Sequence, residues 1–284
     1  MFFKVISNDE EKLSITKNNI NYNIIFNTSD KNPSHLKDLK NQKNFDDENL
    51  TFFLKQKNIY FFLIIWSTDR LFVAVDQVAS KNTLYSKKND LLKVLTSKPN
   101  NCEFDNSVKD EIYYSGYSID NYSLFKDYKC LRPGEYLSIK NKELKIKKWN
   151  VFYPIFLKEK IKNNEELFHD ILFKEFNDIK KNSLNKKIIV PLSAGLDSRL
   201  IVCFLKYHNF EVETFTYGYQ NKKDFKIADQ ISKSLKIKNY KIVMDKQHSS
   251  IYKSDYFKEY LAFRDIGIRA NNFGDFGPLF YLKK

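Results

Sequence analysis

The chain contains few cysteines, and their spacing excludes the two common structural uses of that residue. Three occur among 284 residues, Cys102, Cys130 and Cys203, and no two of them form a C-x-x-C pair. This arrangement gives neither a zinc site nor an evident disulfide framework, and sparse cysteine is typical of a reducing compartment. We therefore expect a cytoplasmic protein, in which Cys203 is a small core residue within an apolar helical pattern.

Long apolar runs are also missing. The longest, residues 59–66, is far shorter than the ~20 residues that a membrane helix requires. The chain begins with Met-Phe-Phe-Lys and then turns polar and acidic, so it lacks the apolar core of a signal peptide. We expect no membrane partner.

The composition otherwise fits a globular protein. Hydrophobic residues make up 42% of the chain and aromatic residues 16%, and the length predicts about two domains. A net charge of +13 would suit a nucleic-acid partner. The lysines are spread along the chain without a long basic block, however, so we interpret the charge as a compositional bias and do not expect nucleic acid to be the partner.

A segment near residue 190 combines a predicted strand, a turn of small residues and a predicted helix. The β-branched run 188–190 is followed by S-A-G-L-D-S at residues 193–198 and then by apolar residues at helical spacing. The first amides of a helix lack intrahelical partners and lie at the positive end of its dipole, so this junction favours an anion. Ser193 and Ser198 add hydroxyl donors, and Asp197 is a natural Mg2+ ligand beside a phosphate. The P-loop pattern G-x-x-x-x-G-K-[ST] is absent.

This segment resembles the PP-loop, S-G-G-x-D-S, of the ATP pyrophosphatases, which cleave ATP between the α and β phosphates. The resemblance implies ATP and Mg2+ as cofactors, with Asp197 as the metal ligand. Ala194 departs from the pattern; its methyl group is tolerable if φ is negative and costly if φ is positive. The alternative is an ordinary strand-to-helix turn. The residues that the resemblance assigns to ATP or pyrophosphate are Leu192, Ser193, Ala194, Gly195, Leu196, Asp197 and Ser198.

The surrounding residues predict a parallel sheet. Residues 211–218 and 240–244 are predicted strands, and a helix that begins near Asp224 lies between them. The order β-α-β-α-β indicates right-handed crossovers, and ligands of such sheets bind at the carboxyl ends of the strands. Upstream, residues 163–179 predict a packing helix. Its apolar stripe comprises Leu167, Ile171, Leu172, Phe176 and Ile179.

The first half of the chain predicts β-structure. Residues 2–6 and 21–26 are short predicted strands, and residues 27–49 are a loop or a weak helix. Residues 59–66 and 70–75 form a predicted hairpin whose first strand is apolar on both faces and should be covered on both sides. Residues 135–139 and 143–147 alternate and predict a second, half-exposed hairpin.

Three motifs in this half resemble the glutamine-dependent asparagine synthetases. The segment D-R-L-F-V-A-V-D at 69–76, with the later Ser80-Lys81 and Leu84-Tyr85, is similar to D-x-x-x-x-L-A-R-D-x-x-G-x-K-P-L-Y-Y. L-R-P-G-E-Y-L at 131–137 is similar to L-P-P-G-x-Y-L, and Trp149 matches the closing aromatic. In the second half of the chain, F-T-Y-G at 215–218 is similar to the family's F-S-V-G.

The resemblance to F-S-V-G implies that Tyr217 and Gly218 contact adenine. A turn glycine explains Gly218 about as well. Asp224 either faces the metal or is an ordinary first-turn carboxylate, and His248 receives no role.

Two departures from the family limit what the resemblance implies. The glutaminase domain of the family uses an amino-terminal cysteine as nucleophile, whereas Phe2 follows Met1 here, and Cys102 and Cys130 are internal. No catalytic residue is therefore assigned. The later S-G-E-G-x-D-E loop and the acceptor-binding region of the family are also missing, so we expect an incomplete synthetase.

The predicted fold class is α/β in two domains. Residues 1–150 are expected to be an antiparallel, β-rich, degenerate glutaminase-like domain, and residues 151–284 the first part of a parallel-sheet synthetase domain. We expect an asparagine synthase-like, AMP-forming ligase that uses an aspartate-like carboxylate acceptor and ammonia, and whose glutaminase activity is lost; a homodimer is possible. A PP-loop enzyme acting on tRNA and a non-catalytic remnant are the alternatives. The sequence does not identify the acceptor.

Overall fold

The computed structural model describes residues 2–6, 12–28, 33–57, 59–151, 163–182, 187–220, 222–244, 246–264 and 276–282. The chain divides into two compact units. The first is Met1–Phe156 with Arg264–Asn271, and the second is Leu157–Phe263 with Asn272–Lys284. This division concerns packing alone, so the assignment of residues 1–150 and 151–284 to a glutaminase-like and a synthetase domain stays a prediction.

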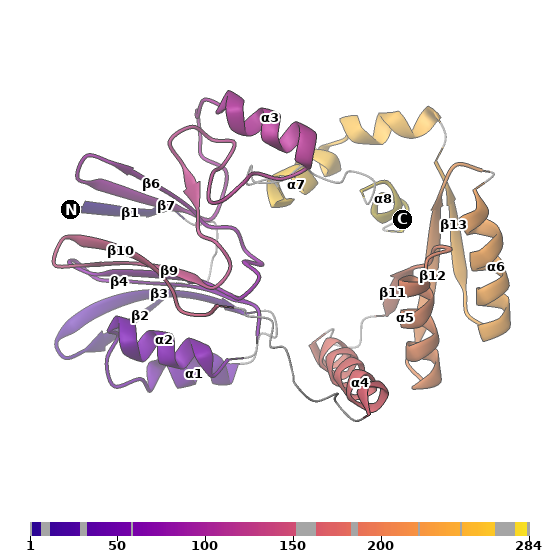
Figure 1. The fold of residues 1–284 in the computed structure, drawn as a ribbon, viewed down its shortest axis with the longest axis horizontal. Coiled ribbons are helices and arrows are strands. Elements are labelled where there is room, and N and C mark those ends of the chain that lie inside the picture. Colours follow the sequence, from indigo (N-terminus) through magenta and orange to yellow (C-terminus); the bar gives the residue numbers. More distant parts are fainter. Residues whose placement is uncertain are drawn as a thin grey trace. The chain divides into compact units, whose positions relative to one another are not determined.

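The first unit contains two facing β-sheets (Figure 1). A six-stranded antiparallel sheet has the order β10-β9-β5-β4-β3-β2, and a four-stranded sheet has the order β1-β7-β6-β8, in which β1 and β7 are parallel. The strands are β1 (Phe2–Ile6), β2 (Lys12–Lys17), β3 (Ile20–Thr28), β4 (Phe61–Trp66), β5 (Leu71–Val75), β6 (Leu84–Lys88), β7 (Leu91–Leu95), β8 (Lys129–Cys130), β9 (Glu135–Lys140) and β10 (Glu143–Lys148).

Strand β4 lies at the centre of this unit because both of its faces are apolar. Phe61, Leu63 and Ile65 belong to one buried cluster, and Phe62 and Ile64 belong to another. The first cluster includes Leu50, Phe53 and Leu54 of α2 (Asp47–Lys55), and the second includes Leu92 and Val94 of β7. The predicted coverage of this strand on both faces is thus confirmed, and so is its hairpin with β5.

The other elements of the first unit agree only in part with those predicted from the sequence. The β9–β10 hairpin is confirmed, with β9 buried over most of its length and β10 largely exposed. Residues 27–49, expected to be a loop or a weak helix, contain α1 (Pro33–Lys40) and the start of α2. Three further features were not predicted from the sequence: β2, the β6–β7 hairpin and α3 (Asn106–Ser115), which Asp105 caps through its side chain.

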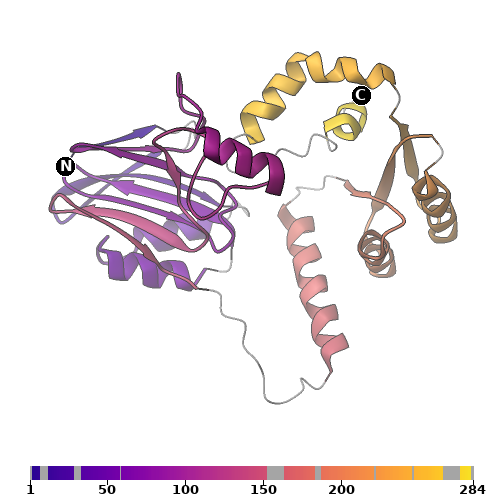
Figure 2. The ribbon, with the colours of Figure 1, turned by 45° about the horizontal axis from the view of Figure 1, so that its top comes forward.

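The second unit contains a three-stranded parallel sheet. Strands β11 (Ile188–Pro191), β12 (Val212–Gly218) and β13 (Asn239–Val243) pair in that order, as the β-α-β-α-β alternation predicts. Helices α5 (Leu196–Tyr207) and α6 (Lys223–Leu235) connect them and contact both the sheet and each other (Figure 2). Helices α4 (Asn164–Asn182), α7 (Asp255–Arg264) and α8 (Phe276–Leu282) and the 3-10 helix η1 (Lys246–Lys253) complete the described elements. No helix in these described ranges has the length and apolar character needed to span a membrane.

Two expectations for the second unit are wrong. In the predicted stripe of α4, Phe176 packs on the core of the sheet, but Leu167, Ile171 and Ile179 are each exposed by 46% or more. Cys203, expected in the core, is exposed. On α5 the buried positions are Val202 and Leu205, so the face that packs on the sheet is narrower than the apolar run of the sequence.

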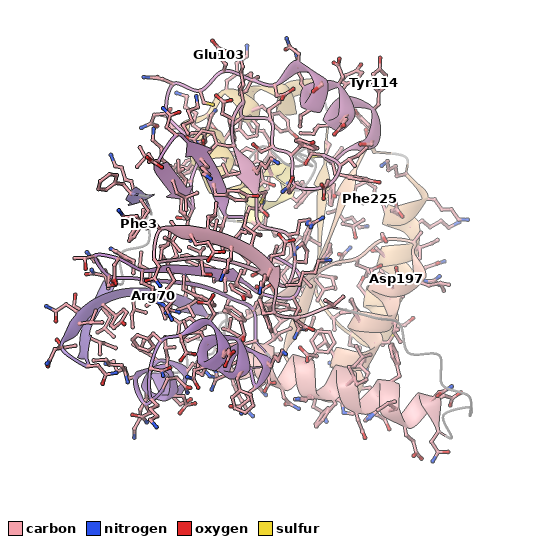
Figure 3. The ribbon with its side chains drawn as sticks, turned by 60° about the vertical axis from the view of Figure 1, so that its left-hand side comes forward. Phe3, Arg70, Glu103, Tyr114, Asp197 and Phe225 are labelled. Carbon is pink, nitrogen blue, oxygen red and sulfur yellow. The ribbon has the colours of Figure 1, made fainter. Side chains whose placement is uncertain are left out.

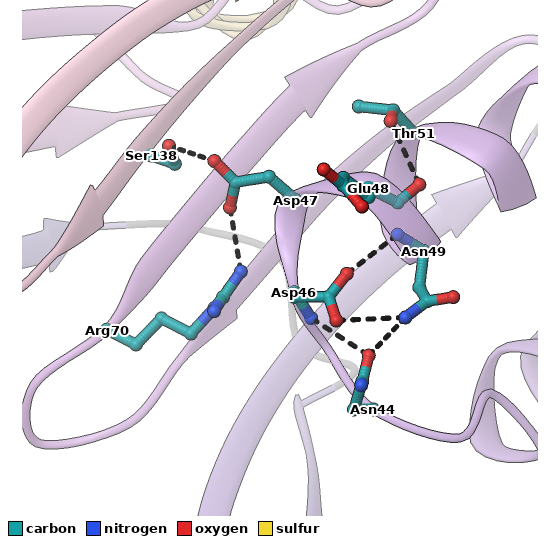
Figure 4. A network of polar contacts seen from close by, with 8 residues as sticks. All are labelled: Asn44, Asp46, Asp47, Glu48, Asn49, Thr51, Arg70 and Ser138. Atoms are coloured by element: carbon teal, nitrogen blue, oxygen red, sulfur yellow. Dashed lines mark hydrogen bonds and ion pairs between the residues drawn. The ribbon is translucent and has the colours of Figure 1, made fainter.

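A network of charged and polar side chains ties α2 to the six-stranded sheet (Figure 4). Asp47 accepts a hydrogen bond from the Arg70 guanidinium at 2.7 Å and another from Ser138 Oγ at 2.6 Å. The Arg70 side chain is 10% exposed, and within the described residues its Nε has no partner. The charge of Arg70 is therefore compensated mainly by Asp47. The neighbouring Asp46 caps α2 by accepting from the amide of Asn49 at 2.8 Å.

Replacing Asp47 should destabilise the first unit strongly. Asp47→Ala leaves a nearly buried guanidinium without its counter-ion, which costs about 2–4 kcal/mol in the free energy of unfolding. Both tryptophans, Trp66 and Trp149, lie in the first unit, so urea unfolding followed by tryptophan fluorescence reports on this unit. Glu103→Ala removes the exposed ion pair with Lys126 and should change little. Equal effects of the two substitutions would contradict the importance of the network.

Candidate functional site

The predicted site lies where β11 ends beside β12. Pro191 pairs with Phe215 in the parallel ladder, and the amide of Leu192 donates to the carbonyl of Phe215 at 2.8 Å. Thr216 Oγ1 donates to the Leu192 carbonyl, also at 2.8 Å, and both residues are buried. The backbone of Leu192 is therefore fixed at both polar groups, and the loop that follows starts from a rigid point at the rim of the sheet.

The loop at residues 193–198 bonds largely to itself. The amide of Ser193 donates to Ser198 Oγ at 3.2 Å, and the amide of Gly195 donates to Ser193 Oγ at 3.1 Å. The two hydroxyl oxygens lie 3.0 Å apart. The sequence predicts that this junction favours an anion, but the amides of Leu192, Ser193, Ala194 and Gly195 already have acceptors within the protein.

The backbone conformation of the loop is compatible with Ala194, the residue that departs from S-G-G-x-D-S. Ala194 is not among the described non-glycine residues with positive φ, so its methyl group causes no backbone strain. Gly195 has φ of −70° and serves as the N-cap of α5. A Cβ at Gly195 would lie 3.2 Å from Ser193 Oγ, which makes the position tight but not forbidden.

The backbone amides in the first turn of α5 could bind an anion. Gly195 offers no side-chain cap, and within the described residues no side-chain acceptor bonds to the amides of Leu196, Asp197 and Ser198. Asp197 is exposed at the surface of this turn and does not point into the core (Figure 3). These amides, the two serine hydroxyls and the Asp197 carboxylate together form a polar surface that suits a polyphosphate with a divalent cation.

A second carboxylate reaches this loop from α6. Asp224, in the first turn of α6, accepts a hydrogen bond from the Ala194 amide at 2.7 Å. The sequence left its role open, since an acidic residue in a first turn is ordinary. No local pattern could have shown that it contacts a residue 30 positions earlier. Within the described residues no group of three or more His, Cys, Asp or Glu side chains could hold a metal ion, so water and phosphate oxygens would complete the coordination of any cation here.

Tyr217 and Gly218 lie on the same rim, at the end of β12. Tyr217 is half-buried and stacks on Phe215 with ring centroids 6.1 Å apart. Gly218 has φ of +148°, a conformation that favours glycine, and its carbonyl accepts from the Met244 amide at 2.8 Å. The parallel register therefore places both residues at the carboxyl end of the strand that adjoins the loop. The side chain of His248 lies outside the described residues.

The comparisons with known proteins bear mainly on this part of the chain. The search of curated proteins gives no match. Among solved structures, glutamine phosphoribosylpyrophosphate amidotransferase from B. subtilis, complexed with ADP and GMP, is 10% identical, with 82% of this chain and 73% of that chain covered and a TM-score of 0.34. A structure described as the allosteric regulatory enzyme of purine biosynthesis is 9% identical, with 82% and 72% covered and a TM-score of 0.32. TM-scores this low carry no argument about fold or activity.

The family model described as asparagine synthase matches residues 185–265, under half of the chain. The matched segment begins just before β11 and contains the loop, α5, β12, α6 and β13. The match thus covers the parallel sheet and every residue of the predicted site, and it indicates an ATP-dependent, amidotransferase-like ligase.

Proposed function

We propose that the chain is an asparagine synthase-like, AMP-forming amide ligase. A substrate carboxylate attacks the α-phosphorus of ATP, and the bond to pyrophosphate breaks, giving an acyl-adenylate. Ammonia then attacks the acyl carbon, AMP leaves with the bonding electrons, and a proton is released. The observation that carries this proposal is the asparagine synthase match over residues 185–265, with S-A-G-L-D-S placed between a parallel strand and an uncapped helix.

Each element of the loop has a role in this proposal. Ser193 and Ser198 hydroxyls and the first-turn amides of α5 bind the pyrophosphate and stabilise its charge as it departs. Asp197 would hold Mg2+, which would neutralise charge on the phosphates. Tyr217 and Gly218 contact the adenine at the neighbouring strand end. The acceptor is a small carboxylic acid of the aspartate type.

The three thiols support the idea that ammonia does not come from glutamine hydrolysis in this chain. Such hydrolysis requires an activated thiolate. Burial raises the pKa of the Cys102 thiol, and nearby Asp127 adds to the rise. Burial raises the pKa of Cys130 to about 11. Cys203 lies on α5, in the other unit. Neither cysteine of the first unit is thus tuned to be a nucleophile.

Two other functions each have one observation in their favour. The charge of +13 favours a PP-loop enzyme that acts on tRNA, and binding of tRNA that weakens steeply with salt would support it. The internal hydrogen bonds of Ser193, Ala194 and Gly195 favour a non-catalytic remnant. Absence of any stabilisation by Mg-ATP would support that reading.

Mg-ATP should stabilise the second unit, and Asp197 should be required for this effect. At about 100 times its Kd, a ligand stabilises the folded state by about 2.7 kcal/mol, which scanning calorimetry detects as a rise of several degrees in Tm. Asp197→Ala should abolish most of the rise, whereas Asp178→Ala, which removes an exposed carboxylate of α4, should keep it. The same variants are then compared in the exchange of pyrophosphate into ATP with aspartate and related acids. If the wild type shows no stabilisation by Mg-ATP and no exchange of pyrophosphate into ATP, the proposal is contradicted.

Alkylation should follow the exposure of the three thiols. At pH 8 iodoacetamide should modify the exposed Cys203 first and Cys130 last. Because burial raises the folded pKa of Cys130 above 9.0, its neutral thiol stabilises the protein below pH 9. This stability is lost as the pH rises towards 11, and Cys130→Ala should flatten that loss. Mass spectrometry of the modified peptides checks the order. Rapid modification of Cys102 or Cys130 would show an activated thiol and contradict the interpretation.

A further inference from the structure

The hydrogen bond between Ala194 and Asp224 places an anion of the protein inside the proposed pyrophosphate loop. The Ala194 amide is the middle one of the S-A-G turn, and Asp224 Oδ1 accepts from it at 2.7 Å. This distance is typical of a charge-assisted bond to a carboxylate. A phosphate oxygen is an acceptor of the same kind. Asp224 thus occupies a donor that a polyphosphate could use.

Among the described contacts, the carboxylate of Asp224 bonds to the loop and not to an amide of its own helix. Lys222 is the N-cap of α6 and makes no side-chain cap bond, and the Asp224 carboxylate is directed to the loop from the first turn. The other loop partners are neutral hydroxyls, Ser193 Oγ and Ser198 Oγ. Among the acceptors of the Ser193, Ala194 and Gly195 amides, Asp224 alone therefore carries a charge that opposes an incoming anion.

Resting on the proposed function, we infer that Asp224 makes the loop select the divalent-cation complex of a polyphosphate over the free polyphosphate. Arg199 Nε donates to the Gly195 carbonyl at 3.1 Å and brings a positive charge to the loop. A free polyanion must still displace the Asp224 carboxylate from the Ala194 amide, and it also meets the exposed carboxylate of Asp197. A cation that arrives with the phosphates removes both obstacles, because it reduces their charge and attracts the carboxylates. Specificity then comes from repulsion of the wrong ligand, not from extra contacts to the right one.

A merely structural role for Asp224 makes the opposite prediction. If the carboxylate serves only to hold the shape of the loop, its removal weakens binding of every ligand. If it excludes free anions, removal of its charge strengthens the binding of free pyrophosphate. Asp224→Asn separates the two because the amide oxygen of asparagine can still accept from Ala194 but carries no charge.

The experiment is titration calorimetry of pyrophosphate into the full chain, once with EDTA and once with excess Mg2+. The wild type should prefer the magnesium complex by at least tenfold. In Asp224→Asn the affinity for free pyrophosphate should rise about tenfold and the preference should fall towards one. Asp229→Asn is the matched control, since it removes one carboxylate from the same helix, where Asp229 pairs with Lys233 and Lys241. It should behave as the wild type.

The outcomes separate this inference from the proposed function. Unchanged or weaker binding of free pyrophosphate by Asp224→Asn, with Mg-pyrophosphate still bound by the wild type, overturns the role of Asp224 alone. Absence of binding of either ligand to all variants overturns the proposed function and the inference with it. Asp224→Ser serves as a second variant if Asp224→Asn has a lower Tm than the wild type, and it should show the same loss of preference.

Discussion

The parallel pairing of β11 with β12 is the constraint on which the proposed site depends. The ladder fixes Pro191 against Phe215, and the side chain of Thr216 then holds the carbonyl of Leu192. A shift of one residue in this register would turn the Thr216 side chain to the other face of the sheet, and its hydroxyl could no longer reach the Leu192 carbonyl. It would also move the loop relative to Tyr217 and Gly218. The chemistry of the rim therefore depends on a buried threonine that touches no ligand in the proposal.

The internal hydrogen bonds of the loop give it a definite shape before any ligand binds. Such preorganisation lowers the entropy cost of binding, provided that the internal acceptors can give way. The acceptors differ in this respect. A serine hydroxyl both donates and accepts, so Ser193 and Ser198 can turn to a phosphate without losing every bond. The bond from Ala194 to Asp224 has no such freedom, because an ionised carboxylate only accepts.

The sequence predicts best those elements whose evidence is local. Periodicity and turn residues predict the apolar strand β4, the alternating hairpin of β9 and β10, and the parallel order of β11, β12 and β13. The β6–β7 hairpin is missed because Lys87 and Lys88 interrupt its apolar run. Helical spacing does not show which apolar face is covered, so the exposure of α4 and Cys203 could not be foreseen. The partner of Ala194 comes from another helix and has no local signal.

Asp47 and Asp224 are both carboxylates that accept hydrogen bonds, but their partners differ in charge and burial. Asp47 meets a guanidinium that is 10% exposed, and its loss leaves that charge unpaired. Asp224 meets a neutral amide on a half-exposed loop. A lone amide holds a carboxylate far less tightly than a buried cation does, so a ligand that brings its own cation can draw Asp224 away. In the proposed function, the uncapped first turn of α5 beside it binds the phosphates.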